Sequence, residues 1–117
     1  MVELEVAGEV LVARLFGEID LRVADDLRRT LEQALDHFPV RHLVFDFEGV
    51  SFIDSTGLGV ILGRYKRLAN AGGRLGVTGL GLPVRRVLEL SGILRVAREF
   101  GSRAEALEAF GGGDAGA

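Results

Sequence analysis

The first twenty residues predict a β-hairpin that leads into a helix. Apolar and acidic residues alternate over residues 2–6, a period of two that indicates a half-exposed edge strand. Residues 7–9 can turn the chain, and the more apolar segment 10–16 predicts a second strand paired with the first. Residues 17–20 close the hairpin, and Asp20 is a candidate N-cap for the next helix.

Two longer segments have the spacing of amphipathic helices. Residues 21–38 carry apolar side chains on one face and charged side chains on the other, and Pro39 ends this helix. Residues 56–71 show the same spacing, with a barer outward face. The expected inward face consists of Leu58, Ile61, Leu62, Tyr65, Leu68 and Ala69, and the outward face of Thr56, Gly59, Val60, Gly63 and Arg67.

The remaining segments predict three more strands and two short helices. The apolar run 42–47 is typical of a strand covered on both faces, and segments 75–78 and 93–97 predict shorter strands. Pro83 suits the first position of a third helix. A final helix opens with the capping box formed by Ser102 and Glu105.

This order of elements predicts an α/β fold. After the hairpin, strands and helices alternate, so the crossovers imply parallel strands. We expect one domain over residues 1–110, with a mixed sheet of about five strands, an antiparallel N-terminal edge hairpin and four packed helices. Residues 111–117 are rich in glycine and predict a flexible C-terminal tail.

Composition narrows the class of protein. The chain has 117 residues, a net charge of −3 and no cysteine, so disulfides and thiolate metal sites are excluded. The acidic balance, with only one tyrosine and no tryptophan, argues against direct nucleic-acid binding. No apolar run approaches the roughly 20 residues that cross a bilayer. We therefore expect a soluble, cytoplasmic protein with no membrane partner.

The most informative residue is Ser55, because it stands where the helix 56–71 should begin. A serine at a helix start is a natural N-cap. A phosphate on the same hydroxyl would meet backbone N–H groups and the positive end of the helix dipole. The neighbouring Asp54 already makes this region negative. A structural cap and a phosphorylation switch are both consistent with this position.

Glycines at 57, 59 and 63 weaken the same helix by roughly 1 kcal/mol each relative to alanine. They do not form a dinucleotide fingerprint, since Leu62 occupies the third glycine position, and the chain has no phosphate-binding loop. No cofactor is therefore expected. Close packing inside the fold and close approach of a partner both remain explanations for these glycines.

Several catalytic classes fit poorly. Glu18 and Asp20 could act as an acid–base pair, although capping and solvation are the more common explanation for such residues. His37 and His42 flank a helix–strand turn and are expected at the surface, so no metal site is predicted. Asp46 ends a strand as in receiver domains, but no acidic pair follows the first strand. A Gly-x-Ser-x-Gly elbow is absent as well.

Three motifs resemble one known family. Residues 54–66 (DSTGLGVILGRYK) closely resemble the signature of STAS-domain anti-sigma factor antagonists, especially the anti-sigma F factor antagonists of spore-forming bacteria. Residues 17–20 (GEID) match that family's Gly-Glu-Leu-Asp element with isoleucine for leucine, and residues 83–92 are similar to its third helix. The resemblance extends from about residue 2 to residue 110.

The resemblance implies a non-enzymatic regulator that switches partners. The unphosphorylated protein would bind an anti-sigma factor, itself a serine kinase, and release the sigma factor. The kinase would then phosphorylate Ser55 and the complex would dissociate, until a serine phosphatase resets it. The residues expected to contact the partner, some from the motif and some from the bare helix face, are Glu18, Asp20, Asp54, Thr56, Gly57, Gly59, Val60 and Gly63.

Alternatives stay open at this point. The chain could be the STAS module of a general stress-signalling complex, or a small nucleotide-binding module. Thr56 stands where the family often has serine, so a second hydroxyl competes as phosphate acceptor. Docking requires the Asp20 loop to lie beside the helix that Ser55 opens, and parallel strands would place both loops at the same end of the sheet.

Overall fold

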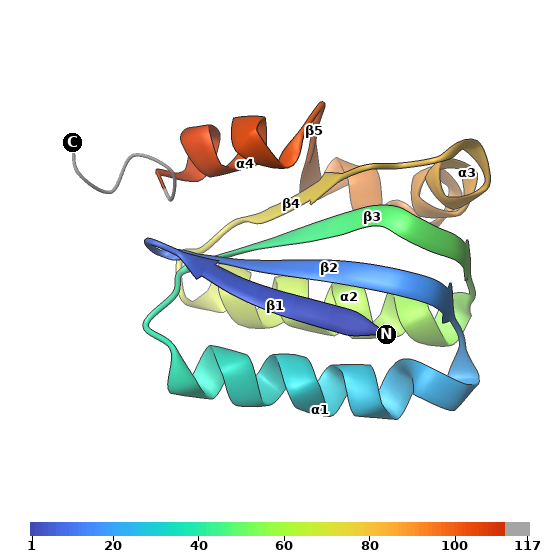
Figure 1. Ribbon diagram of the computed structural model, residues 1–117, viewed down its shortest axis with the longest axis horizontal. Coiled ribbons are helices and arrows are strands. Elements are labelled where there is room, and N and C mark those ends of the chain that lie inside the picture. The colour runs from blue at the N-terminus through green and yellow to red at the C-terminus, as the bar shows by residue number, and fades with distance from the viewer. Residues whose placement is uncertain (112–117) are drawn as a thin grey trace.

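The computed structural model describes residues 1–111, and they form a five-stranded mixed sheet with four α-helices (Figure 1). The strands lie in the order β1-β2-β3-β4-β5; β1 is antiparallel to β2, and the other neighbouring pairs are parallel. The predicted fold class is confirmed, while residues 112–117 of the predicted tail lie outside the described residues. The elements are β1 (Val2–Ala7), β2 (Val10–Ile19), α1 (Leu21–His37), β3 (His42–Ile53), α2 (Ser55–Asn70), β4 (Leu75–Thr78), α3 (Leu82–Ser91), β5 (Ala97–Phe100) and α4 (Arg103–Phe110).

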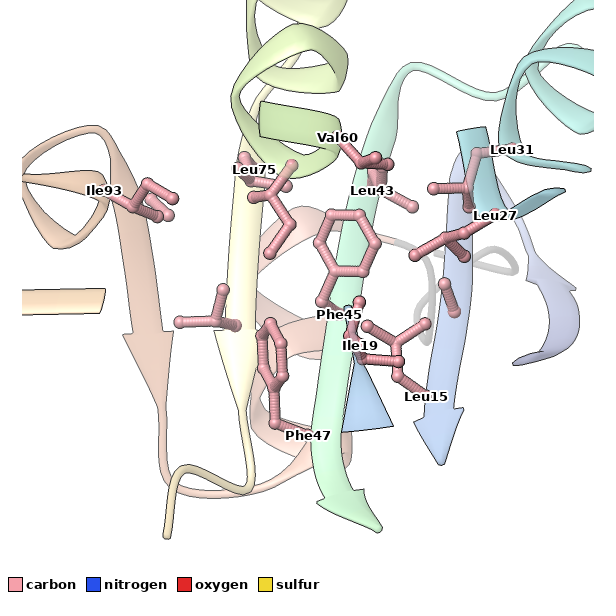
Figure 2. Close-up of a cluster of buried hydrophobic side chains, with 14 of the residues drawn as sticks. Leu15, Ile19, Leu27, Leu31, Leu43, Phe45, Phe47, Val60, Leu75 and Ile93 are labelled. Atoms are coloured by element: carbon pink, nitrogen blue, oxygen red, sulfur yellow. The ribbon is translucent and has the colours of Figure 1, made fainter. Parts of the chain in front are cut away.

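The helices divide unequally between the two faces of the sheet. α1, α2 and α3 cover one face, where alternate residues of β2, β3 and β4 pack against them, and α4 covers part of the other (Figures 1 and 2). Figure 2 shows Phe45 and Phe47 of β3 at the centre of the larger core. None of the helices within residues 1–111 is both long and apolar enough to span a bilayer.

β2 and β3 are longer than the sequence predicted. The expected strands ended at Phe16 and Phe47, whereas the observed strands continue to Ile19 and Ile53. Gly49 has the composition of a turn, but it pairs with Phe16 and continues the sheet. A Cβ at Gly49 would lie 2.7 Å from Cδ1 of Phe16, so glycine allows the two strands to approach each other here.

The last strand was predicted in the wrong place. Residues 93–97 were expected to form it, but Ile93–Arg95 form a 3₁₀ turn and β5 is Ala97–Phe100. Gly92 adopts φ +84° and ends α3, which turns Ile93 directly into the core. The apolar pattern of this segment therefore reflects packing at a turn.

His42 is buried, which corrects its predicted surface position, whereas His37 is exposed as expected. Nδ1 of His42 accepts a hydrogen bond from the backbone N–H of Arg74 at 3.0 Å, and its ring packs 5.0 Å from that of Phe110. Burial lowers the pKa of His42, because the charged imidazolium loses solvation. His42 is thus a structural residue between β4 and α4.

The rotation of α2 about its axis also differs from the prediction. Val60 was expected on the outward face and is 6% exposed, whereas Leu62 was expected inside and is 39% exposed. The hydrophobic pattern could not show this rotation, because a charged residue, Arg64, occupies one of the buried positions. The buried residues of α2 are Gly57, Val60, Ile61, Arg64 and Leu68.

Arg64 is the least well satisfied buried group in the described chain. It is 8% exposed, Nη2 lies 3.6 Å from Glu32 of α1, and Nε and Nη1 have no hydrogen-bond partner within residues 1–111. Burial lowers the pKa of its guanidinium, because the charged form is disfavoured away from water. Arg67 already pairs with Glu32 and Asp36 at 2.7 Å each.

We therefore predict that Arg64→Met leaves the free energy of unfolding unchanged or raises it by up to about 4 kcal/mol. Methionine fills the same space without a buried charge, and Glu32 keeps Arg67 as its partner. Arg67→Met, at a half-exposed pair, should change stability by less than about 1 kcal/mol. Urea denaturation measures both; a loss above roughly 2 kcal/mol in Arg64→Met would contradict this view of Arg64.

Candidate functional site

Two strand–helix turns lie side by side at the carboxyl ends of β2 and β3. Ile19 and Ile53 are register partners in this parallel pair, and the N–H of Asp54 donates to the carbonyl of Ile19 at 3.2 Å. Asp20 and Asp54, each one residue further on, therefore begin α1 and α2 next to each other. The predicted adjacency of the Asp20 loop and the start of α2 is confirmed.

Asp54 is the N-cap of α2, which corrects the expectation that Ser55 caps this helix. One carboxylate oxygen of Asp54 accepts hydrogen bonds from the N–H groups of Thr56 at 2.9 Å and Gly57 at 3.1 Å. The same oxygen accepts from the hydroxyl of Thr56 at 2.5 Å. That hydroxyl, followed by the N–H groups, holds the pKa of Asp54 below its usual range.

The two neighbouring hydroxyl groups have different environments. Ser55 is the first residue of α2 and is exposed, and its hydroxyl makes no hydrogen bond within residues 1–111. The Thr56 hydroxyl is half-buried and is held by Asp54. Ser55 is thus accessible from solvent, whereas modification of Thr56 would first break the hydrogen bond between its hydroxyl and Asp54.

Asp20 caps α1 as predicted. The structure also shows that Arg22 contacts this loop, which the sequence analysis did not predict. The N–H of Arg22 donates to Asp20 at 3.0 Å, and its guanidinium contacts Asp20 at 2.8 Å and Glu18 at 3.1 Å. The Arg22 side chain lowers the pKa of Asp20, and the nearby Asp54 carboxylate opposes that shift. These contacts favour capping over acid–base chemistry. The i, i+4 spacing of Glu18 and Arg22 could have indicated their ion pair from the sequence.

The glycines of α2 fall into two kinds. A Cβ at Gly57 would lie 2.7 Å from the carbonyl oxygen of Ile19 and 2.9 Å from Cγ2 of the same residue, so Gly57 serves internal packing. In the described part of the chain, no heavy atom would lie within 4 Å of a Cβ at Gly59 or Gly63. The packing explanation therefore applies to Gly57, and only Gly59 and Gly63 leave the outside of the helix bare.

These residues define an outer stripe on α2. Ser55, Gly59 and Gly63 are spaced four residues apart, so they lie on one helix face, with Leu62 and Lys66 beside them. We call Ser55, Gly59, Leu62, Gly63 and Lys66 the α2 outer stripe. Gly57 and Val60 were predicted to contact a partner, and they lie beneath this surface.

Three large apolar side chains at the same edge of the sheet are exposed and were missed from the sequence. Leu21 follows the α1 cap, Phe52 is the register partner of Glu18, and Leu82 begins α3. Phe52 was missed because the predicted strand ended before it.

Within residues 1–111, no group of three or more histidine, aspartate or glutamate side chains could hold a metal ion.

Comparison with known proteins identifies the family of this chain. Residues 1–106 match the STAS domain family. The chain belongs to the STAS domain family. This STAS domain is 36% identical over 106 residues to the anti-sigma F factor antagonist of Paenibacillus polymyxa, with 91% of each chain covered. It is also 36% identical over 81 residues to the anti-sigma-B factor antagonist of Bacillus subtilis, covering 66% of this chain and 69% of the relative.

Solved structures agree with the assignment. The unphosphorylated form of the anti-sigma factor antagonist SpoIIAA matches with a TM-score of 0.82 and 28% identity, covering 95% of this STAS domain and 97% of that chain. The phosphorylated form of the Bacillus cell fate determinant SpoIIAA matches with a TM-score of 0.75 and 30% identity, covering 93% and 98%. The resemblance to STAS-domain anti-sigma factor antagonists is thus confirmed.

The difference between the glycines gives a stability prediction. Gly59→Ala and Gly63→Ala should each raise the free energy of unfolding by roughly 0.5–1 kcal/mol, because alanine restricts the unfolded chain and meets no neighbour. Gly57→Ala should lower it by about 1–3 kcal/mol, because its Cβ would collide with the backbone of Ile19. Urea denaturation of the three variants checks this; stabilisation by Gly57→Ala would contradict the packing role.

The Asp54 cap predicts a pH dependence. The folded pKa of Asp54 lies below its ordinary value of 3.8, so its contribution is complete above that value and is lost as the pH falls through the folded pKa. Asp54→Asn keeps an acceptor oxygen without a titrating charge. The urea midpoints of wild type and Asp54→Asn should differ most near neutral pH and converge below about pH 4. A constant difference across this range would show that the charge of Asp54 does not stabilise α2.

Proposed function

We propose that this STAS domain is an anti-sigma factor antagonist controlled by phosphorylation of Ser55. The unphosphorylated form binds an anti-sigma factor serine kinase, which then releases its sigma factor. Phosphorylated Ser55 abolishes that binding. The observation that carries the proposal is the exposed Ser55 hydroxyl beside a Thr56 hydroxyl that Asp54 already holds. The names of the related antagonists support the same role.

A phosphate on Ser55 suits the fold and changes the surface. It adds a charge of roughly −1.5 to −2 and three acceptor oxygens at the positive end of the α2 dipole. Asp54 occupies the N–H groups of Thr56 and Gly57, so the phosphate stays outside the helix. Glu18 and Asp20 already compete for Arg22, the nearest cation of this loop. The added charge therefore remains uncompensated on the docking surface.

The docking surface consists of the α2 outer stripe and the Asp20 loop. Gly59 and Gly63 leave the helix backbone open to close approach, and Leu62 supplies an apolar contact between them. Glu18, Asp20 and Thr56 border this surface at the carboxyl ends of β2 and β3. Gly57, Val60 and Asp54 act from beneath it, because they fix the position and rotation of α2.

The domain acts as a regulator and not as an enzyme in this proposal. The kinase supplies the phosphoryl group from ATP, and a separate serine phosphatase hydrolyses the phosphoserine. The switch then needs only a reversible change of charge at one exposed residue. This explains why the glycine-rich helix carries its acceptor at the first helical position.

Labelling with the cognate anti-sigma factor kinase and ATP tests the acceptor. Wild type and Thr56→Ser should each take up one phosphate on Ser55, because serine keeps the hydroxyl bonded to Asp54. Ser55→Ala should take up none and still bind the kinase. Peptide mass spectrometry and a binding titration give both results. Undiminished labelling of Ser55→Ala, with the phosphate on Thr56, would contradict the assignment.

A further inference from the structure

A cavity lies at the end of the domain opposite Ser55. α2 begins at the carboxyl ends of β2 and β3 and ends near the start of β4, so its two ends lie at opposite ends of the sheet (Figure 1). Residues from the C-terminal half of α2, the loop before β4, the start of β5 and the end of α4 line an open hollow of about 350 Å³. We call it the α2–β4 pocket. Leu75 and Phe110 of its lining belong to the core, whereas the exposed Arg74 and Arg98 belong neither to the core nor to the docking surface.

Two arginines line this pocket. Arg74 belongs to the loop before β4, and Arg98 belongs to β5, the strand paired with β4. The guanidinium of Arg98 stacks 4.8 Å from the ring centroid of Phe100, which holds it in place. Among residues 1–111, no carboxylate oxygen lies within 4.0 Å of either guanidinium.

The surroundings add positive charge and a rigid rim. Arg41 donates from Nη2 to the carbonyl of Gly72 at 3.4 Å, and its one carboxylate contact is Glu9 at 4.0 Å. A Cβ at Gly73 would lie 1.9 Å from the carbonyl oxygen of Arg41, so only glycine allows this loop to pack. Three arginines thus gather at this end of the sheet, where Glu9 contacts Arg41, and Glu105 and Glu108 line the neighbouring hollow beside Arg98 without an ion pair to it within 4.0 Å.

The same charges also affect the pKa of the buried His42. After burial, the charge of Arg41 is the next largest contribution that lowers its pKa, and the charge of Arg74 acts in the same direction. Glu9 opposes them. The lowered pKa of His42 thus has the same origin as the positive charge at this end of the sheet, namely the positions of Arg41 and Arg74.

The other walls of the pocket are apolar or aromatic. Tyr65 of α2 and Phe110 of α4 contribute rings, and Leu75 and Val96 contribute aliphatic side chains. Tyr65 also carries a phenolic hydroxyl that can donate or accept a hydrogen bond. Ligand pockets of roughly 300–1,000 Å³ commonly combine such apolar walls with a few convergent polar groups.

We propose that the α2–β4 pocket binds a small anion that carries an aromatic ring. Arg74 and Arg98 pair with its phosphate or carboxylate, and Tyr65 and Phe110 contact its ring. The ligand takes neither the place of the anti-sigma factor nor the phosphate of Ser55, because those lie at the other end of α2. The site therefore stands independently of the function proposed above.

Titration of the full-length, ¹⁵N-labelled protein with phenyl phosphate and with benzoate tests this site by amide NMR. One or both ring-bearing anions should shift the amides of Gly73, Leu75 and Val96 in a saturable way, with Kd about 1 mM or tighter, and leave Ser55 unchanged. The two arms distinguish a phosphate ligand from a carboxylate ligand. Inorganic phosphate should bind at least tenfold more weakly, because it lacks the ring.

Variants make the test specific. The double substitution Arg74→Gln and Arg98→Gln should weaken binding at least tenfold, while Arg86→Gln on α3, an exposed arginine outside the pocket, should not change it. Arg74, Arg98 and Arg86 are all exposed, and the amide spectrum verifies that each variant is folded. Absence of saturable shifts at the pocket amides overturns the proposal, as does undiminished binding by the double variant or equal binding of inorganic phosphate.

Discussion

The parallel pairing of β2 with β3 is the constraint on which the rest of this structure depends. It continues to Ile19 and Ile53, further than the apolar pattern requires, and the N–H of Asp54 extends it by one hydrogen bond to Ile19. That hydrogen bond sets the start of α2 beside the start of α1. One surface therefore contains the two acidic caps, the exposed Ser55 hydroxyl and the Asp20 loop.

α2 combines strong support from below with a weak outer face. Asp54 satisfies the first N–H groups of the helix, and Gly57 allows it to pack directly on the backbone of Ile19. Gly59 and Gly63 have no such packing role, since no heavy atom of residues 1–111 would lie within 4 Å of a Cβ at either position. The proposed docking of a partner would account for their cost in helix stability, roughly 1 kcal/mol each. In the proposed switch, this rigid underside and bare outer face allow a phosphate on Ser55 to change binding without unfolding the domain.

Much of this account could be predicted from the sequence, and the failures have physical causes. Periodicity gave the element order and the mixed sheet, and the motif around Ser55 gave the family. The ends of β2 and β3 were misplaced because Gly49 resembles a turn, whereas cross-strand packing against Phe16 holds it in the sheet. Local composition cannot report a contact between strands that are distant in sequence.

Side-chain environment was harder to predict than the order of the elements. Val60 was predicted outside and is buried, and Leu62 was predicted inside and is exposed. The prediction failed because Arg64 is buried, and hydrophobic periodicity does not place an arginine inside. Ser55 looked like the cap because caps are commonly serine, but Asp54 is one residue earlier and accepts three hydrogen bonds. The distinction between Ser55 and Thr56, on which the proposed switch depends, exists only in three dimensions.

The most direct test of the central claim uses protein phosphorylated stoichiometrically on Ser55. Its amide spectrum and thermal unfolding are compared with those of the unmodified protein, and both forms are titrated with the anti-sigma factor kinase. The account predicts an unchanged fold, stability within about 1 kcal/mol, and at least a tenfold loss of affinity. Equal affinity of the two forms, or loss of binding only because the phosphorylated domain unfolds, would contradict it.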